Sequence, residues 1–433
     1  MLVLTSRRTP IMSTENESEP DPRLRNIIIF DSLSTVAWQM CMTSPLVLFM
    51  RSLGAPSLAL GLLAGLNPLM AVLQLPMSRF VERVGHRRLM MFGWGMRTAV
   101  FAPMILMPFI ADSIGKPLAV ILVLVMIALF TMLRSMAVVA WLPWMSALIP
   151  ATQRGEFLAR DRFFMNITSL LGLALSGLLL AQGSPHDYAE VFLVGELAAV
   201  ASLFYLNRIP SPQMPAEHAT SPAPRPSVRA VLREPNFRKI VAFSALAQII
   251  NLGAGAFVTV YARTRIGLSD STLLWLSASA SLLVIFTMAW VRNRLDRTGS
   301  KPFLGITLAW WTISVLIWAL LAASGASLGV IVAPVLLVVT ECFAWLFELF
   351  NTRLTMNTLA TSDNNATGFA AYSMIVNVTA GIAPIVFGAL LDALHGFELP
   401  VGALRFDNYT ALFGLELIVL ALAVLALRRV RNA

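Results

Sequence analysis

Residues 118–141 read LAVILVLVMIALFTMLRSMAVVAW, and this stretch decides the class of protein. A helix needs about 20 apolar residues to cross a bilayer, and the only charged residue in this stretch is Arg134. The whole chain of 433 residues has the same character, with 57% hydrophobic and 13% charged residues. Because so few charges cannot cover a water-facing surface, the composition excludes a soluble globular protein and predicts an integral membrane protein.

Twelve apolar segments of this kind follow one another along the chain, and we expect each to be a transmembrane helix. The sequence therefore predicts an all-α integral membrane protein with twelve transmembrane helices. The expected spans are residues 27–50, 57–78, 89–111, 118–141, 164–183, 191–207, 240–262, 271–290, 303–323, 328–350, 369–391 and 409–427.

The distribution of basic residues predicts the orientation of these helices. Of the 32 Lys and Arg residues, 25 lie in segments on the same side as the N-terminus and only five lie in the loops of the other side. Because cytoplasmic loops of membrane proteins are enriched in Lys and Arg, both termini are expected in the cytoplasm, and a bacterial inner membrane is the expected location. The net charge of +9 thus reflects topology, and no nucleic-acid partner is predicted.

One polar stretch, residues 208–239, divides the spans into two sets of six. Its many prolines exclude a continuous helix or strand, so that it reads as an exposed linker. The predicted organisation is a cytoplasmic tail (1–26), an N-terminal six-helix bundle (27–207), a cytoplasmic linker (208–239), a C-terminal six-helix bundle (240–427) and a short cytoplasmic tail (428–433).

The two sets of spans resemble each other. Residues 166–180 (NITSLLGLALSGLLL) match residues 377–391 (NVTAGIAPIVFGALL) at both ends, and residues 82–85 (ERVG) match residues 296–299 (DRTG) at nearly the same offset. Two matches at equivalent places indicate a duplication. Parallel six-helix repeats are a known transporter architecture with the substrate site between the halves, so two pseudo-symmetric bundles are expected.

Three loops carry a resemblance to a known family. Residues 78–88 (SRFVERVGHRR), residues 292–301 and residues 150–155 (PATQRG) are similar to cytoplasmic motifs of the major facilitator superfamily. The resemblance implies that such charges hold the cytoplasmic side closed; the alternative is that they serve only to set the orientation. The candidate gating residues are Glu82, Arg83, Gly85, Arg87, Asp296, Arg297 and Gly299.

Ionisable residues inside the spans are candidates for function, because each is costly to insert into the bilayer. The resemblance implies that the first, fourth, seventh and tenth spans line a central cavity, which selects Asp31, Arg134 and Glu341. Asp31, Arg134 and Arg97 of the third span are expected to form a mutually paired network, either as part of the site or as a structural brace. Gln248 and Asn251 in the seventh span could line the cavity or form hydrogen bonds between helices.

Glu341 is the expected site of proton binding and release. It lies near the middle of its span, and the nearest basic residue of that segment is Arg353. Burial disfavours a charged carboxylate, whereas Arg134 should keep Asp31 ionised.

The predicted function is secondary active transport of a small solute by alternating access, coupled to protons as symport, by a monomer in the lipid bilayer. Two alternatives remain: a non-transporting assembly or receptor protein on the same fold, and a drug/proton efflux antiporter. The second is disfavoured because the fifth span lacks the glycine–proline signature of such antiporters. No enzyme is predicted, since there is no nucleophile–base pattern. No metal or cofactor is expected, because the histidines are scattered outside the spans.

Overall fold

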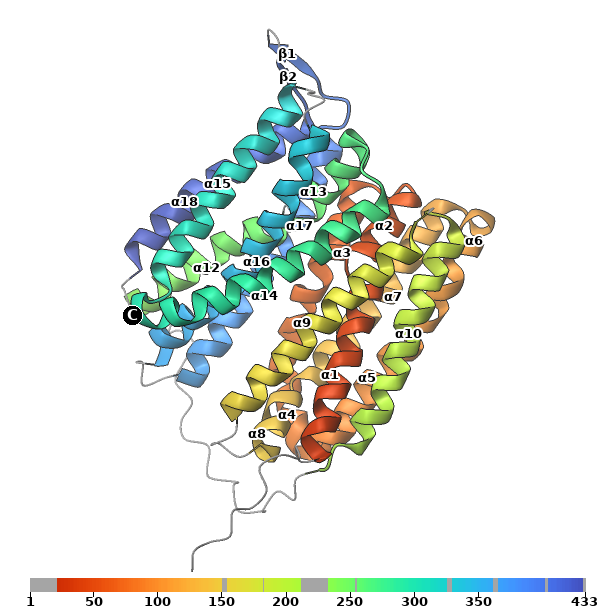
Figure 1. Ribbon diagram of the computed structural model, residues 1–433, viewed down its shortest axis with the longest axis vertical. Coiled ribbons are helices and arrows are strands. Elements are labelled where there is room, and N and C mark those ends of the chain that lie inside the picture. Colours follow the sequence, from red (N-terminus) through yellow and green to blue (C-terminus); the bar gives the residue numbers. More distant parts are fainter. Residues whose placement is uncertain are drawn as a thin grey trace, which may run out of the picture.

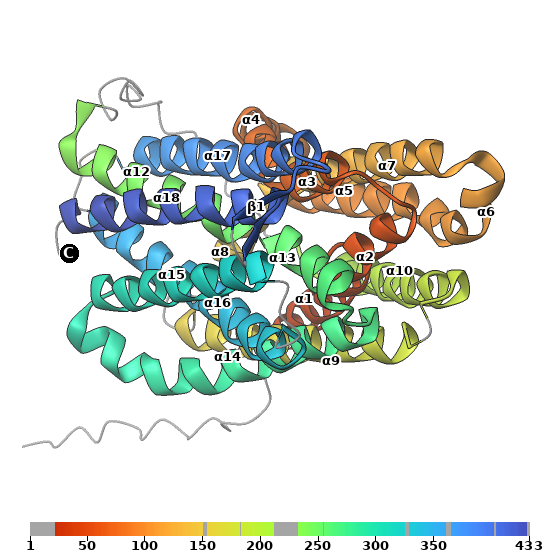
Figure 2. The same cartoon turned by 90° about the horizontal axis from the view of Figure 1, so that it is seen from above.

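The computed structural model describes residues 22–149, 154–181, 183–211, 233–253, 255–324, 329–360, 365–401 and 404–430. These residues are helical almost throughout and form two groups of helices that lie side by side (Figures 1 and 2). Within the described ranges, eleven helical segments are long and apolar enough to cross a membrane, and a shorter apolar segment, Ser57–Leu73, lies where the second span is predicted. The predicted all-α membrane fold is confirmed, and twelve spans fit it.

The first group is interrupted at several points, most of them near proline. Proline lacks an amide N–H and therefore breaks or bends a helix interior, although it is well tolerated in the first turn. Pro45 begins the second part of the first span, and Pro68 precedes a turn of 3-10 helix in the second. The elements are α1 (Pro22–Cys41), α2 (Ser44–Ser52), α3 (Ser57–Met70), η1 (Ala71–Leu73), α4 (Gln74–Val84), α5 (His86–Phe101), η2 (Ala102–Leu106), α6 (Met107–Ile114), α7 (Lys116–Val138), α8 (Trp141–Leu148), α9 (Arg154–Leu179) and α10 (Pro185–Arg208).

The second group contains longer helices and one small sheet. Its elements are α12 (Pro235–Gly253), α13 (Gly255–Tyr261), the π-helix η4 (Ala262–Ile266), α14 (Asp270–Thr298), α15 (Lys301–Ser324), α16 (Gly329–Ala360), α17 (Asn365–Ala393), β1 (Leu399–Val401), β2 (Leu404–Phe406) and α18 (Asn408–Arg429). The antiparallel strands β1 and β2 are not predicted by the sequence. We call the end of the molecule that carries them the hairpin end, at the top of Figure 1, and the opposite end, which carries α4 and α8, the α8 end.

Parts of the predicted tails and linker are helical. Within the predicted tail 1–26, α1 already begins at Pro22, a favourable residue in the first turn, and residues 1–21 lie outside the described part. Within the predicted linker 208–239, Arg208 ends α10 and Pro235 begins α12, while residues 212–232 are not among those described. In the predicted tail 428–433, α18 continues to Arg429, and residues 431–433 lie outside the described part.

Glycine residues allow the two groups to touch where α3 crosses α17. A Cβ atom at Gly61 would overlap the carbonyl of Pro384, and one at Gly65 would overlap the carbonyl of Gly381. Only glycine lets two helix backbones approach this closely. Gly61 and Gly65 therefore pack against another helix of the same chain.

A polar cluster also joins the groups at the hairpin end. Arg263 of η4 forms an ion pair with Asp270 of α14 at 2.7 Å and donates to the carbonyl of Leu48 on α2 at 3.0 Å. The hydroxyl of Tyr188 on α10 donates to the same Asp270 carboxylate at 2.5 Å. We call these four residues the hairpin-end cluster. Beside it, Asp392 of α17 accepts from the backbone N–H groups at the start of α3.

Candidate functional site

A cavity of about 570 Å³ lies between helices of both groups. It contains four of the six residues that the sequence proposes for a substrate or proton cavity: Asp31, Arg97, Arg134 and Glu341. Both halves of the molecule therefore contribute to one site. The lining residues are Ile27, Phe30, Asp31, Ser34, Thr35, Trp38, Gln39, Thr43, Ser44, Trp94, Arg97, Arg134, Val138, Trp141, Met145, Phe157, Asp161, Arg162, Met165, Asn166, Ser169, Leu173, Ser281, Glu341 and Trp345.

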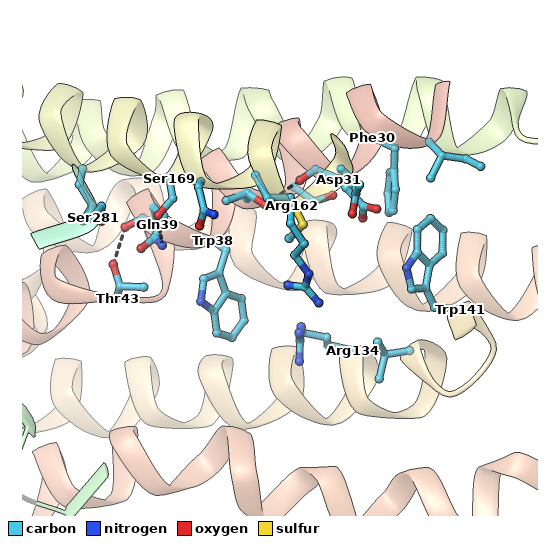
Figure 3. Close-up of a pocket in the computed structure, with 18 of the residues that line it drawn as sticks. Phe30, Asp31, Trp38, Gln39, Thr43, Arg134, Trp141, Arg162, Ser169 and Ser281 are labelled. Atoms are coloured by element: carbon cyan, nitrogen blue, oxygen red, sulfur yellow. Dashed lines mark hydrogen bonds between the residues drawn. The ribbon is translucent and has the colours of Figure 1, made fainter. Parts of the chain in front are cut away.

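Two helices supply most of the wall through regular spacing. On α9, Phe157, Asp161, Met165, Ser169 and Leu173 all line the cavity, and residues four apart lie on one face of a helix. On α1, Asp31, Thr35 and Gln39 have the same spacing and also line the cavity. The side chain of Gln39 donates a hydrogen bond to Ser169 of α9 at 2.6 Å. In Figure 3, the α1 and α9 side chains line one wall of the space, and Arg134 approaches from the facing helix.

Asp161 and Arg162 are site residues that the sequence analysis missed. Both residues lie between the predicted spans 118–141 and 164–183, whereas α9 begins at Arg154 and carries them into the cavity. Asp161 is 7% exposed and its Oδ1 atom has no hydrogen-bond partner among the described residues. The periodic spacing from Phe157 onward is the signal that could have identified them.

The expected mutual pairing of Asp31, Arg97 and Arg134 is wrong. The ion pairs between described residues are Lys116–Asp112, Arg263–Asp270 and Arg265–Asp407, and none of them involves this set. Instead, each guanidinium lies over an aromatic ring, Arg97 over Trp94 at 4.1 Å and Arg134 over Trp38 at 4.7 Å. Cation–π contact offers an alternative to ion pairing within a span.

Glu341 faces the cavity from the second half of the molecule. It lies on α16, one helical turn before Trp345, which also lines the cavity. Its polar neighbour across the helix contact is Ser277 of α14, one turn before the cavity residue Ser281. No basic residue forms an ion pair with Glu341 in the described part of the chain.

The two remaining candidates, Gln248 and Asn251, do not line this cavity. Both are on α12 and donate to Oε1 of Glu348 on α16, at 2.6 and 3.0 Å. The structure therefore places them in hydrogen bonds between helices, which is one of the two roles that the sequence leaves open.

The proposed gating motifs lie at the α8 end, between α4 and α5 and between α14 and α15. Gly85 and Gly299 have positive φ angles of 87° and 76°, a conformation that glycine adopts without steric cost. Arg87 donates to the backbone and the side chain of Asn207 at the end of α10, within its own half. Arg297 is exposed in the last turn of α14. The side chains of Glu82, Arg83 and Asp296 lie outside what the structure describes.

In the part of the chain that the structure describes, no three His, Cys, Asp or Glu side chains gather as a metal-binding group. The cavity instead combines aromatic surfaces, hydroxyl and amide groups, and charges of both signs. Such a lining suits a polar or ionic organic solute, because a few polar groups within an apolar wall fix its orientation.

Comparison with solved structures shows the fold. The chain superimposes on a nucleoside transporter, NupG, with a TM-score of 0.65 and 12% identity, covering 95% of this chain and 100% of that one. A bacterial homologue of the iron transporter ferroportin, in an inward-facing state, gives a TM-score of 0.67 at 12% identity and covers 94% and 98% of the two chains. A bacterial metal transporter gives 0.66 at 13% identity, covering 95% and 99%.

Comparison at the level of sequence identifies the family. No curated protein matches the chain significantly, but a family model, described as Major Facilitator Superfamily, matches residues 32–358. This match spans most of the chain and agrees with the fold, the duplicated halves and the motifs at residues 78–88 and 292–301. The chain therefore belongs to the major facilitator superfamily.

Proposed function

We propose that this protein is a secondary transporter that moves a small solute across the membrane by alternating access. The observation that carries the proposal is the charged cavity between the two halves, to which α1, α5, α7 and α9 contribute from one side and α14 and α16 from the other. Rocking of the halves would expose such a site alternately to the two sides of the membrane. The wall of charged and aromatic residues argues against a scaffold that has lost transport.

The hairpin end faces the outside in this proposal, and the α8 end faces the cytoplasm. The excess of Lys and Arg near the termini and in residues 208–239 supports this orientation. The hairpin-end cluster then closes the outer side, so that the described conformation is inward-facing. In inside-out vesicles, limited proteolysis should cleave within residues 208–239 and leave two membrane-embedded fragments. Cleavage only from the outside would overturn the orientation.

Coupling to protons as symport is the proposed energy source, with Glu341 as the carrier. A transported ion must bind a group whose environment differs between the two conformations, and Glu341 lies where the halves meet. The charged residues that share its cavity are Asp31, Asp161, Arg97, Arg134 and Arg162. Glu82 and Asp296 are proposed to bias the conformational equilibrium at the cytoplasmic side without contacting the solute.

Uptake by proteoliposomes tests the proposal. The purified chain should accumulate at least one member of a panel of small solutes. A pH gradient with the acidic side outside should increase that accumulation relative to equal pH on both sides. Accumulation driven in the opposite direction, with solute leaving as protons enter, would favour the antiporter. The absence of any flux, together with a cavity that is never exposed to the outer side, would favour the assembly or receptor alternative.

A further inference from the structure

Two arginines in the cavity have guanidinium groups without an ionic partner. Arg97 of α5 is 4% exposed, and its Nε atom has no hydrogen-bond partner among the described residues. Neither Arg97 nor Arg134 of α7 takes part in an ion pair in the described ranges. A buried charge left without a partner is strongly destabilising, so this arrangement requires a compensating interaction.

Aromatic rings satisfy only part of each guanidinium group. Arg97 lies 4.1 Å from the centroid of Trp94 and 5.2 Å from that of Phe130, and Arg134 lies 4.7 Å from Trp38. A ring supplies no acceptor oxygen for the five N–H donors of each guanidinium. The amide oxygen of Asn67 accepts one of them from Arg134, at 3.2 Å. The remaining donors are available to a ligand.

Acidic residues near the arginines do not occupy these donors. Glu196 of α10 is the acid that acts electrostatically on Arg97, but it forms no ion pair with it and does not line the cavity. Asp31 and Asp161 are influenced by each other and by Arg162. Glu341 belongs to the other half of the molecule. Arg97 and Arg134 influence one another, so two like charges share one region of the wall.

Two other residues that line the cavity also carry unsatisfied polar atoms. The indole Nε1 of Trp94 and the hydroxyl of Ser34 are buried without a partner in the described part of the chain, and both residues line the cavity. Nearly all buried polar groups in native proteins have a partner. Two guanidinium groups that line a cavity without a carboxylate partner suit the binding of a carboxylate or a phosphate group, because its oxygens accept several charge-assisted hydrogen bonds.

We infer that Arg97 and Arg134 bind the anionic group of the transported solute, which is therefore a small organic carboxylate or phosphate. The inference rests on the transport function proposed above and adds the class of substrate. Arg97 and Arg134 hold the anionic group, the aromatic rings of Trp38 and Trp94 keep both guanidinium groups in place, and the rest of the solute faces Asp161 and α16. A cavity of about 570 Å³ accommodates a molecule of this kind.

Binding to the purified full-length chain in lipid nanodiscs tests the inference. The probes are acetate, succinate, inorganic phosphate and glycerol phosphate, compared with glucose, uridine and choline at constant ionic strength. Thermal stability and tryptophan fluorescence report binding, since Trp94 and Trp38 touch the two arginines. At least one organic anion should bind, and Arg97→Gln or Arg134→Gln should weaken it by about tenfold or more, because each charged hydrogen bond contributes about 1.5–3 kcal/mol.

Two further variants keep the result interpretable. Asn67→Asp retains both arginines but gives Arg134 an internal carboxylate, and it should also abolish anion binding. Arg294→Gln is the matched control, because Arg294 lies 3.8 Å from the ring of Trp290 and does not line the cavity; it should bind as the unmodified chain does. The fold of each variant is checked by its thermal midpoint without added solute.

The outcomes separate this inference from the proposed function. Anion binding that survives both arginine substitutions would overturn the inference, as would the failure of every anion to bind. If proteoliposomes of the same preparation then take up glucose, uridine or choline, transport stands and the anion site does not. If no solute is bound or transported, both fail.

Discussion

Two acidic residues from different halves of the chain face the cavity, and their neighbours distinguish them. Asp31 on α1 interacts electrostatically with two charged neighbours, Asp161 and Arg162. Glu341 on α16 forms a hydrogen bond with Ser277, and it has no ion pair with a described residue. Because loss of water disfavours a charged carboxylate that lacks a cation, we propose Glu341, in preference to Asp31, as the carrier of a transported proton.

Glu341→Gln tests this assignment. The variant cannot release a proton, so accumulation driven by a pH gradient should be abolished while downhill flux and exchange persist. Uptake by proteoliposomes, with and without the gradient, measures both quantities. Glu348→Gln is the matched control, because Glu348 lies two turns further along α16, outside the cavity lining, and accepts hydrogen bonds from Gln248 and Asn251; it should still couple. If Glu341→Gln still concentrates solute, the role passes to Asp31.

Among the helices, the crossing of α3 and α17 limits how the halves can pack. A side chain at Gly61 would meet the backbone of Pro384 and one at Gly388 would meet that of Ser57. Backbone atoms cannot move aside as side chains can, and overpacking typically costs about 1–3 kcal/mol.

Gly61→Val should therefore lower the thermal midpoint of the purified chain, or separate the halves at the hairpin end. Gly95→Ala is the control, since no atom lies within 4 Å of a Cβ at that position. Alanine favours a helix over glycine by about 1 kcal/mol, so this variant should be as stable as the parent or slightly more stable. Equal midpoints for Gly61→Val and the parent chain would show that the crossing is not close-packed.

Sequence predicts the elements better than their details. The apolar segments identify the helices because burial in lipid requires long apolar runs. Interruptions such as η1 after Pro68 depend instead on how the backbone groups near the proline form hydrogen bonds. The hairpin of β1 and β2 is missed because three-residue strands leave no periodic signal.

The site is predicted in part for a similar reason. Asp31, Arg97, Arg134 and Glu341 stand out as charges within spans, and the structure brings them to one cavity. The position of a residue along a predicted span does not give the direction of its side chain, however. The contacts of Arg97 and Arg134 with tryptophan rings therefore cannot be predicted from that position. Asp161 is missed because the charged residues in the first turns of α9 are also typical of a loop between spans.

At the scale of the whole molecule, we propose that the hairpin-end cluster holds that end closed. Tyr188 belongs to the first half, while Asp270 and Arg263 belong to the second, and Arg263 returns to the first half at the carbonyl of Leu48. In this proposal, the contacts break when the hairpin end opens. Removing one of them must shift the population toward the conformation that lacks it.

Tyr188→Phe removes one such contact with little change in shape. A hydrogen bond to a charged group contributes about 1.5–3 kcal/mol, so the population open at the hairpin end should rise about tenfold or more. Hydrogen exchange should then increase at α2 and α13 and decrease at α8. Asp112→Asn is the control, because the pair Lys116–Asp112 is exposed and lies within one half; it should leave the exchange pattern unchanged. An identical pattern for Tyr188→Phe would show that the cluster does not hold the halves.

Access to the cavity from both sides is the most direct test of alternating access. A single cysteine at Asn166, a half-buried cavity residue, is introduced after the two native cysteines, Cys41 and Cys342, are replaced by serine. Membrane-impermeant thiol reagents are then applied to right-side-out and inside-out vesicles. We predict rapid reaction from the cytoplasmic side and slower reaction from the outer side, with the slow reaction accelerated by Tyr188→Phe. A cysteine that reacts from one side only, in both backgrounds, would contradict alternating access.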